Sequence, residues 1–271
     1  MPGTRRSFAR IWTRIDLGVL ALGLTAHKFA RHLVYFACFP RAALQTVTDL
    51  YYDRHSFYVE DEHNDRGLFD WEAAVVDRHF GDVHRVLVTS CGGGREVCAL
   101  AETGREVVGT ESHPDLCRAA QARCAAHPGS AVYCLAPTDA PPGSDAFDAV
   151  VLGWGGYSHL TPSAARVDFL RTLRARLRPD GVLLASFLGR RAGGDRAVSA
   201  ALSLANPLRC LFFHDPLEAG DGVSVGFCHR FRPGEAADEA RAAGFRIVEE
   251  AVSAPGIVRD RYPYLVARNA E

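Results

Sequence analysis

The sequence predicts an α/β protein built on a doubly wound, mostly parallel sheet. An apolar run at residues 86–88 leads into the glycine-rich turn at residues 90–94, and a helical pattern follows from Arg95. A second apolar run then ends at the carboxylate of Glu111. This order of elements is typical of the nucleoside-binding half of such a sheet: a strand, a glycine turn, a helix, a second strand and an acid. The glycines let the backbone approach a ligand, the helix N-terminus offers unpaired N–H groups, and the acid suits a ribose diol.

The composition bounds the class of protein. With 271 residues, 48% of them apolar, the chain has the size of one large domain or of one domain with an appendage. Its formal net charge of −1 provides no strong overall field to recruit nucleic acid. The eight cysteines include no C-x-x-C pattern. They are therefore expected to be small buried hydrophobes in a reducing cytoplasm, and no metal site is expected.

The first forty residues are predicted to be helical. Residues 17–26 are nearly all apolar, a cationic break follows at residues 27–28, and residues 33–39 form a second apolar run. Two short runs of this kind do not make the roughly 20-residue apolar stretch that a membrane-spanning helix needs. One or two amphipathic helices are therefore expected.

Three uses of this N-terminal segment stay open. Residues 1–48 carry seven basic residues and one acid, so a helix lying on a membrane surface is one use. A lid over the active site and a homodimer contact are the others. The aromatic residues at 51–58 either cover the pocket as part of a lid or pack the N-terminal helix on the sheet. We expect residues 1–66 to form this helical lid or attachment segment, and residues 67–271 to form the main domain.

The glycine turn excludes two common nucleotide-binding motifs. A dinucleotide fingerprint needs a third glycine after Gly92 and Gly94, and that position holds Val97. A G-x-x-x-x-G-K-[ST] phosphate loop is absent from the sequence.

What remains resembles motif I of the class I S-adenosylmethionine-dependent methyltransferases, usually an acid, an apolar residue and then G-x-G-x-G. Ser90, Gly92 and Gly94 fall on the three glycine positions, with serine replacing the first glycine. Val88 stands where the family usually has Asp or Glu, which contacts the methionine end of the cofactor. Glu111 matches the acid at the end of the second strand.

Four later segments resemble the same family in the same order. Residues 147–152 resemble the fourth strand, 173–184 the helix, Pro-x-Gly turn and fifth strand, and 231–248 the helix and sixth strand. Residues 264–268 are expected to form the last strand, antiparallel at the edge of the sheet. The resemblance covers about residues 83–268. It implies a seven-stranded, Rossmann-like methyltransferase fold with an N-terminal helical appendage, and S-adenosylmethionine as the cofactor.

Candidate site residues lie in the loops at the carboxyl ends of the strands, where ligands of open α/β sheets bind. The resemblance and this placement together give a cofactor site made by Ser90, Cys91, Gly92, Gly94, Glu111, Ser112, Asp139, Gly153 and Trp154.

Two residues in the loop after the fourth strand are candidates for a general base, namely Tyr157 and His159. Two alternatives stay open. His159 makes only a structural or capping hydrogen bond, or no base is needed because the methyl group of the donor is already activated. The segment 189–222 is expected either to shape the acceptor pocket or to be an ordinary packed excursion.

We expect a cytoplasmic bacterial enzyme that methylates a small molecule in secondary or cell-envelope metabolism. A nucleic-acid acceptor is disfavoured, because the loop after the fourth strand lacks the Asn/Asp-Pro-Pro-Tyr type of sequence. Two rivals remain. One is the same fold with other adenosylmethionine chemistry or with lost turnover. The other is a peripheral membrane protein that acts through its basic N-terminal helices. The acceptor atom stays open between O, N, S and C.

Overall fold

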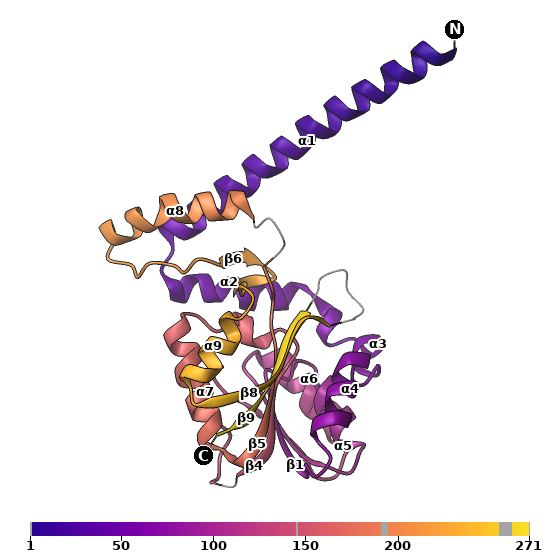
Figure 1. Ribbon diagram of the computed structural model, residues 1–271, viewed down its shortest axis with the longest axis vertical. Coiled ribbons are helices and arrows are strands. Elements are labelled where there is room, and N and C mark those ends of the chain that lie inside the picture. Colours follow the sequence, from indigo (N-terminus) through magenta and orange to yellow (C-terminus); the bar gives the residue numbers. More distant parts are fainter. Residues whose placement is uncertain (1, 145, 191–194, 255–261, 271) are drawn as a thin grey trace. The chain divides into compact units, whose positions relative to one another are not determined.

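The computed structural model describes residues 2–144, 146–190, 195–254 and 262–270. Its backbone contacts divide the chain into two compact units (Figure 1). Unit 1 consists of Met1–Leu44 and Arg191–Gly222, and unit 2 of Gln45–Arg190 and Val223–Glu271.

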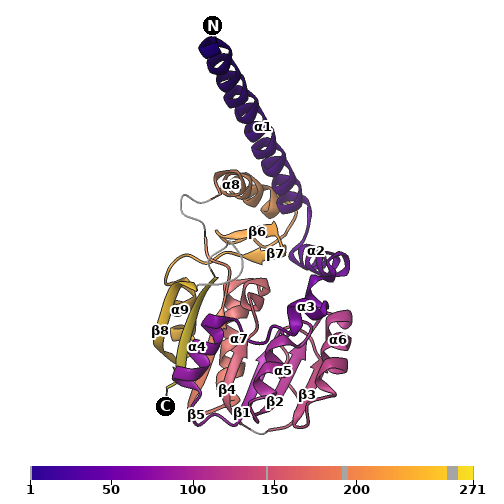
Figure 2. The ribbon, with the colours of Figure 1, turned by 90° about the vertical axis from the view of Figure 1, so that its right-hand side faces the viewer.

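Unit 2 is built on a seven-stranded sheet with the strand order β3-β2-β1-β4-β5-β9-β8 (Figure 2). Strands β1 to β5 pair in parallel, as the sequence predicted. The order runs outward in both directions from the β1–β4 pair, which places the switch point of the topology between these two strands. The strands are β1 (Arg85–Thr89), β2 (Glu106–Glu111), β3 (Ser130–Cys134), β4 (Phe147–Leu152), β5 (Leu177–Ser186), β8 (Phe245–Ala254) and β9 (Tyr262–Asn269).

The last strand does not lie at the edge of the sheet, which corrects the expectation from the sequence. Strand β9 is antiparallel, but it pairs with β5 on one side and β8 on the other. Its central position explains the burial of residues 263–267, which are covered on both faces.

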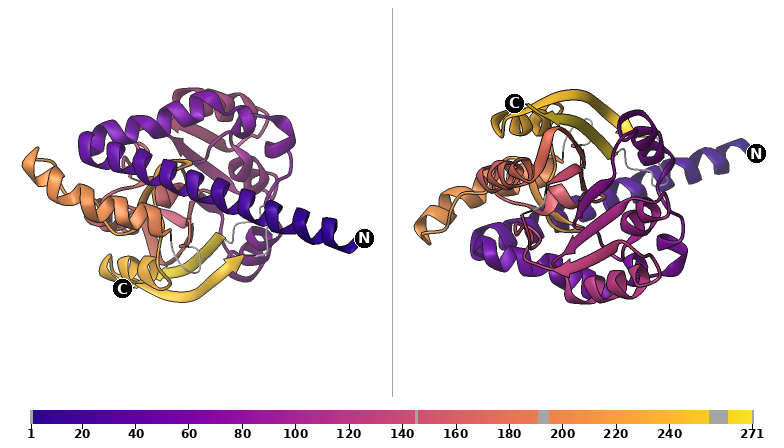
Figure 3. Two further views of the ribbon diagram at one scale, coloured as in Figure 1. Left: turned by 90° about the horizontal axis from the view of Figure 1, so that it is seen from above. Right: turned by 90° about the horizontal axis from the view of Figure 1, so that it is seen from below.

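Helices cover both faces of this sheet, as the view along the strands shows (Figure 3). One face carries α4 (Asp70–His79), α5 (Arg95–Ala101) and α6 (Pro114–Cys124). The other face carries α7 (Ser163–Ala175) and α9 (Glu235–Ala242).

Strand β1 shows why its sequence is an unbroken apolar run. Val86 and Val88 point into the core beneath α4, α5 and α6, whereas Leu87 points into the core beneath α7 and α9. Successive side chains of a strand alternate between the two faces, so a strand covered on both sides needs apolar residues at every position.

Unit 1 contains the long helix α1 (Pro2–Cys38) and α8 (Arg196–Leu211), which pack on each other. Arg209 of α8 is fully buried and donates to the carbonyl oxygens of Phe36 (2.6 Å) and Phe39 (2.8 Å). Part of the segment 189–222 therefore folds as a helix against α1. Among the described residues, no helix combines the length and the apolar character that a membrane span requires.

This division differs from the boundary expected after residue 66. Two sequence-distant segments, α1 and α8, share unit 1, and residues 45–66 share unit 2 with the sheet. The assignment of residues 1–66 to a lid or attachment segment and of residues 67–271 to the main domain stays a prediction.

Two short regions complete unit 2. The first is the part of α2 (Arg41–Arg54) from Gln45 onward, followed by the 3-10 turn η1 (Ser56–Tyr58) and α3 (Asp61–Asn64). We call residues 45–64 the cover segment. The second is the 3-10 turn η2 (Gly156–His159) after β4; a small two-stranded sheet of β6 (Asp221–Ser224) and β7 (Gly226–His229) follows later in the chain.

The cysteines follow the expectation only in part. Cys91, Cys98, Cys124 and Cys228 are buried and take no part in a disulfide, as expected of small hydrophobes. Cys117 of α6 and Cys134 of β3 instead form a disulfide, so the expectation of uniformly reduced cysteines is wrong for this pair.

Candidate cofactor and acceptor pocket

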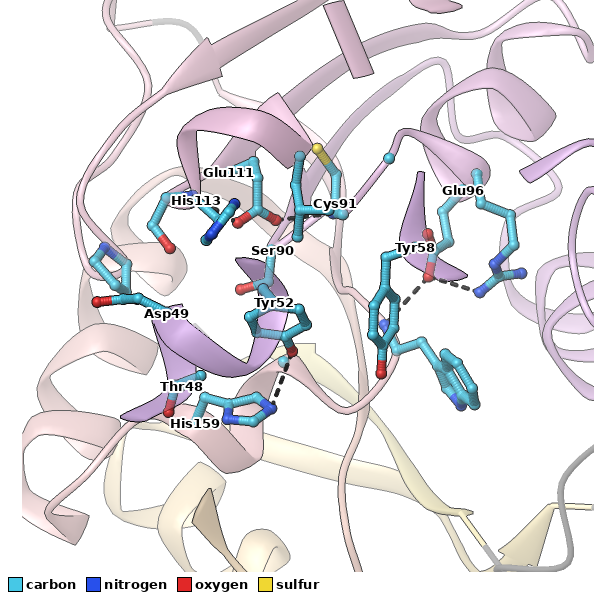
Figure 4. Close-up of a pocket in the computed structure, with 18 of the residues that line it drawn as sticks. Thr48, Asp49, Tyr52, Tyr58, Ser90, Cys91, Glu96, Glu111, His113 and His159 are labelled. Atoms are coloured by element: carbon cyan, nitrogen blue, oxygen red, sulfur yellow. Dashed lines mark hydrogen bonds and ion pairs between the residues drawn. The ribbon is translucent and has the colours of Figure 1, made fainter. Parts of the chain in front are cut away.

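A pocket in unit 2 lies at the carboxyl ends of β1, β2 and β4, where open α/β sheets bind ligands (Figure 4). The cover segment contributes its other wall. Of the residues predicted for the site, seven line it: Ser90, Cys91, Gly92, Glu111, Ser112, Trp154 and His159.

The turn after β1 has the backbone that a glycine-rich motif requires. Ser90, Gly92 and Gly94 all have positive φ angles, of 52°, 56° and 98°. Ser90 thus adopts a left-handed conformation at the first glycine position of the motif, which is uncommon for a residue with a side chain. Gly94 is absent from the pocket lining and serves packing, because a Cβ there would lie 3.2 Å from the Cα of Ala120 on α6.

Val97 of α5 occupies the position of the third glycine in the dinucleotide fingerprint, and it packs against a glycine of β2. Val97 is fully buried on α5, and its Cγ2 would lie 3.0 Å from a Cβ built on Gly109 of β2. Here the glycine that permits close packing of helix and strand is therefore on the strand, which explains how α5 packs closely without a glycine of its own.

Glu111 is held rigidly at the end of β2. Its carboxylate accepts hydrogen bonds from the backbone N–H groups of Gly92, Ser112 and His113, at 2.8 to 2.9 Å. Burial raises the pKa of Glu111, and these three N–H groups oppose that rise. The bond to Gly92 ties the acid directly to the glycine turn.

Three of its side chains hold the cover segment over the pocket, namely Thr48, Asp53 and Asn64. The hydroxyl of Thr48 donates to the carbonyl of Phe227 (3.2 Å) and accepts from the N–H of the same residue (2.9 Å). Asp53 pairs with His113 at 3.2 Å. The amide nitrogen of Asn64 donates within the segment, and the side chain of Asn64 lies so close to Gly93 that a Cβ there would be 2.8 Å from Oδ1.

His159 faces the pocket in a defined tautomer. Its Nδ1 lies 3.2 Å from the carbonyl oxygen of Phe227, which can only accept, so Nδ1 carries the proton. Nε2 then carries a lone pair and accepts from the hydroxyl of Tyr52, 3.3 Å away (Figure 4). Burial lowers the pKa of His159 and raises the pKa of Tyr52 well above its usual value. At neutral pH the imidazole is therefore a neutral acceptor and the phenol its donor.

Tyr157, the other candidate base, points away from the pocket. Its ring is buried against Phe231, and its hydroxyl donates to Glu239 on α9 at 2.5 Å. Glu239 also binds the fully buried Arg166 and the hydroxyl of Ser163. Tyr157 thus belongs to an ion-pair network beneath η2, and the structure does not bring it to the site.

Two other predicted residues also lie outside the pocket lining. Gly153 allows the loop after β4 to approach the loop after β1, since a Cβ there would lie 2.4 Å from the carbonyl oxygen of Ser90. Asp139 is exposed in a turn after β3, where Pro137 contributes to the pocket instead.

Several lining residues were missed because they come from the cover segment or from the first turn of α5. Tyr52, Tyr58 and His63 present aromatic rings, and the ring of His63 lies 5.8 Å from that of Trp154. Burial also lowers the pKa of His63 to about 4, so this ring is neutral. The tyrosine-rich run at 51–58 was the signal in the sequence for the first two.

A buried charged cluster lies at the first turn of α5. Arg95 is almost fully buried and binds Glu72 through two hydrogen bonds, of 2.6 and 2.8 Å. The same guanidinium donates to Glu96 at 2.7 Å and to the carbonyl of Gly67 at 2.8 Å. Two buried carboxylates therefore share one guanidinium.

The sheet and the pocket define a Rossmann-like α/β protein with a buried carboxylate after β2 and an enclosed imidazole after β4. Comparison with known proteins narrows this class. Residues 86–181 match the family model described as "Methyltransferase domain". No match was found among curated proteins. Residues 86–181 are thus a methyltransferase domain, and unit 2 has the fold of S-adenosylmethionine-dependent methyltransferases, which implies S-adenosylmethionine as the cofactor.

Solved structures agree with this assignment at the level of the fold. The CcbJ methyltransferase from Streptomyces caelestis is 18% identical, with a TM-score of 0.54 over 74% of this chain and 89% of that one. An S-adenosylmethionine-bound amino pentose methyltransferase from Micromonospora echinaspora, CalS10, is 21% identical, with a TM-score of 0.53 over 77% and 95%. The [4+2]-cyclase SpnF is 17% identical, with a TM-score of 0.54 over 73% and 80%.

The residues of the pocket fit this cofactor. The carboxylate of Glu111 lies at the end of β2, where the acid of nucleoside-binding sheets contacts the hydroxyls of a ribose. The aromatic faces of Tyr52, Tyr58 and Trp154 suit a positively charged sulfonium.

Proposed function

We propose that the protein transfers a methyl group from S-adenosylmethionine to a small-molecule acceptor, with His159 as the general base. The observation that carries this proposal is the neutral imidazole whose Nε2 lone pair faces the pocket beneath Tyr52 of the cover segment. Such an enclosed base suits a small-molecule acceptor, and the loop after β4 lacks the Asn/Asp-Pro-Pro-Tyr type of sequence. The similar structure CalS10 is an amino pentose methyltransferase involved in calicheamicin biosynthesis, which fits an acceptor from bacterial secondary metabolism.

S-adenosylmethionine supplies an electrophilic methyl group on a sulfonium, so a nucleophile of the acceptor needs little more than position and loss of its proton. His159 would take that proton on Nε2, while the carbonyl of Phe227 keeps Nδ1–H in place and stabilises the imidazolium. Tyr52, which stays protonated, would release Nε2 when an acceptor arrives. The cover segment would exclude water from the reaction.

The test uses the purified full chain, S-adenosylmethionine and a panel of small phenols, alcohols, amines and thiols, with S-adenosylhomocysteine as the measured product. We expect one class of acceptor to support turnover. His159→Gln is then expected to lower kcat about 100-fold or more, because general-base catalysis typically contributes 10²–10⁴-fold. His84→Gln, an exposed histidine before β1, is the matched control and should leave kcat unchanged.

The pH profile separates a base from a structural residue. The imidazole acts only when neutral, so kcat/KM should rise with pH through the lowered pKa of His159 and then level off below the usual value near 6.5. The His159→Gln variant should lack this limb. Equal rates and equal pH profiles in variant and wild type would remove His159 from the chemistry, and turnover only on a nucleic acid would contradict a small-molecule acceptor.

A second role, attachment to a membrane surface, is favoured by one observation in unit 1. Four apolar side chains of α1 are each more than half exposed, namely Val19, Leu20, Leu22 and Leu24. A helix with apolar side chains around its whole circumference is usually buried against a membrane or another protein surface. The basic residues of the first 48 positions fit anionic lipid. Co-sedimentation with anionic vesicles should be lost in a Leu20→Ser, Leu24→Ser variant. Loss of dimerisation in sizing experiments, without vesicle binding, would indicate a dimer contact instead.

A further inference from the structure

The side chain at position 88 cannot perform the role that the family assigns to it. In the resemblance, Val88 occupies the position of an acid that contacts the methionine end of the cofactor. The structure buries Val88 completely in the core between β1 and the helices α4, α5 and α6. An isopropyl group offers no hydrogen bond, so a cationic group at that end of the pocket needs another partner.

Glu96 is a buried carboxylate in the lining of the pocket, and its hydrogen bonds engage one oxygen. It lies in the first turn of α5, lines the pocket and is only 4% exposed. Oε1 accepts from Arg95 at 2.7 Å and from the backbone N–H of Trp154 at 3.2 Å. Among the described residues none donates to Oε2, and Figure 4 shows this oxygen directed away from both donors of Oε1.

The charges around Glu96 do not balance within the protein. Arg95 is the cation of the cluster, and it already binds Glu72 through two hydrogen bonds. His63, which also lines this part of the pocket, is neutral because its pKa is lowered to about 4. Two buried carboxylates therefore share one guanidinium at a site where burial disfavours a carboxylate without a full partner, and burial raises the pKa of Glu72. A bound cation would supply that partner.

Asn64 adds a second acceptor at the same wall of the pocket. Its side chain is 3% exposed, and its Oδ1 is a buried oxygen without a hydrogen-bond partner among the described residues. This oxygen lies against Gly93 of the glycine turn, whereas the amide nitrogen is engaged by two carbonyls of the cover segment. Two buried side chains with free acceptor oxygens and no free donor favour a ligand group that donates and carries positive charge.

We propose that Glu96, through Oε2, binds the α-ammonium group of the cofactor's methionine end and so takes over the role that the family gives to the acid at position 88. This inference rests on the proposed use of the pocket for S-adenosylmethionine. Glu96 is a binding residue in this proposal and takes no part in proton transfer.

Calorimetric titration of Glu96→Gln with four ligands tests the proposal. Glutamine keeps the shape of the side chain and an oxygen for Arg95 and Trp154, but it replaces the free anionic oxygen. Affinity for S-adenosylmethionine and S-adenosylhomocysteine should fall about 10- to 100-fold, the range for one lost hydrogen bond to a charged group. Decarboxylated S-adenosylmethionine, which keeps the ammonium group, should lose as much. Affinity for 5′-methylthioadenosine, which lacks the amino-acid end, should stay within about twofold of the wild-type value.

Glu102→Gln, at the exposed end of the same helix, is the matched control and should bind all four ligands as the wild type does. Unchanged binding of S-adenosylhomocysteine by Glu96→Gln would overturn the proposal. Equal losses for S-adenosylhomocysteine and 5′-methylthioadenosine would also overturn it, since Glu96 would then shape the whole pocket. Failure of the proposed function looks different, because the wild-type protein itself would bind none of the ligands.

Discussion

Replacing Tyr157 with Phe is expected to weaken the fold and to leave methyl transfer intact. Tyr157 and His159 are two residues apart in η2, yet one binds the buried Glu239 and the other lines the pocket. In a 3-10 turn, residues two positions apart point in different directions. The variant therefore separates a structural tyrosine from a catalytic one.

The size of the effect follows from the contacts of Glu239. The Phe variant loses one hydrogen bond to a carboxylate, which is typically worth about 1.5–3 kcal/mol. Glu239 keeps Arg166 and Ser163 as donors, so its charge is not left unpaired. The ring also keeps its stacking on Phe231, so little cavity is created. We expect a loss of about 2 kcal/mol in the free energy of unfolding, or about 4–8 °C in Tm for a domain of this size.

Urea unfolding of the full chain measures the free energy, and S-adenosylhomocysteine release with the best acceptor measures kcat. Tyr133→Phe, on a partly exposed ring of β3, is the control and should change stability by less than about 0.5 kcal/mol. A hundredfold loss of kcat in Tyr157→Phe at unchanged stability would refute this reasoning and return Tyr157 to the chemistry.

Two further predictions concern the pocket. Glu111→Ala should lower the affinity for S-adenosylhomocysteine and for 5′-methylthioadenosine by about 100-fold or more, because both ligands carry the ribose. Calorimetry measures both affinities, and an unchanged value for either ligand would contradict a ribose contact. His63 should make the fold less stable as pH falls from 6.5 towards 4, since its pKa is lowered to about 4 in the folded state and the unfolded chain takes up the proton first. The loss is at most about 3 kcal/mol, and urea unfolding should show a smaller change over this pH range in His63→Phe.

The central unit of the fold could be predicted from the sequence because it is local. Strand β1, the glycine turn, α5 and the acid Glu111 span fewer than 30 residues, and their residue types are dictated by burial, backbone conformation and ligand contact together. Position 90 illustrates the limit of the pattern. The sequence shows a serine where the motif has glycine, and only the structure shows that this serine keeps the glycine-like backbone.

The rest of the site depends on contacts between segments far apart in the sequence. Tyr52 and Asn64 reach the pocket because Thr48 binds Phe227 and because Gly93 has no side chain, and neither cause is visible locally. The wrong edge position predicted for β9 has a related cause. The sequence predicts that the last strand is antiparallel, but its pairing with β5 and β8 depends on contacts between segments far apart in the sequence. Glu96 was overlooked since an acid in the first turn of a helix has an ordinary explanation in the helix dipole.

The pairing of Val88 with Glu96 leads to a last prediction. Position 88 is fully buried, so Val88→Asp places a carboxylate in an apolar core and is expected to cost several kcal/mol. Part of that cost comes from the unbalanced charge of the Glu72–Arg95–Glu96 cluster on the same face of the sheet. In the Glu96→Gln background this charge is gone, so the same substitution should cost less and should restore some affinity for S-adenosylhomocysteine.

A double-mutant cycle in urea, with calorimetry on the same four proteins, measures both effects. We expect a coupling free energy of about 1 kcal/mol or more between the two positions, which is the range for groups that interact. Purely additive effects on stability and on binding would show that the two positions are independent. Coupling in stability and in binding would show that the carboxylate for the ligand can stand either at position 88 of the strand or at position 96 of the helix. The reason would be that this part of the core tolerates one carboxylate beside the ligand and not two.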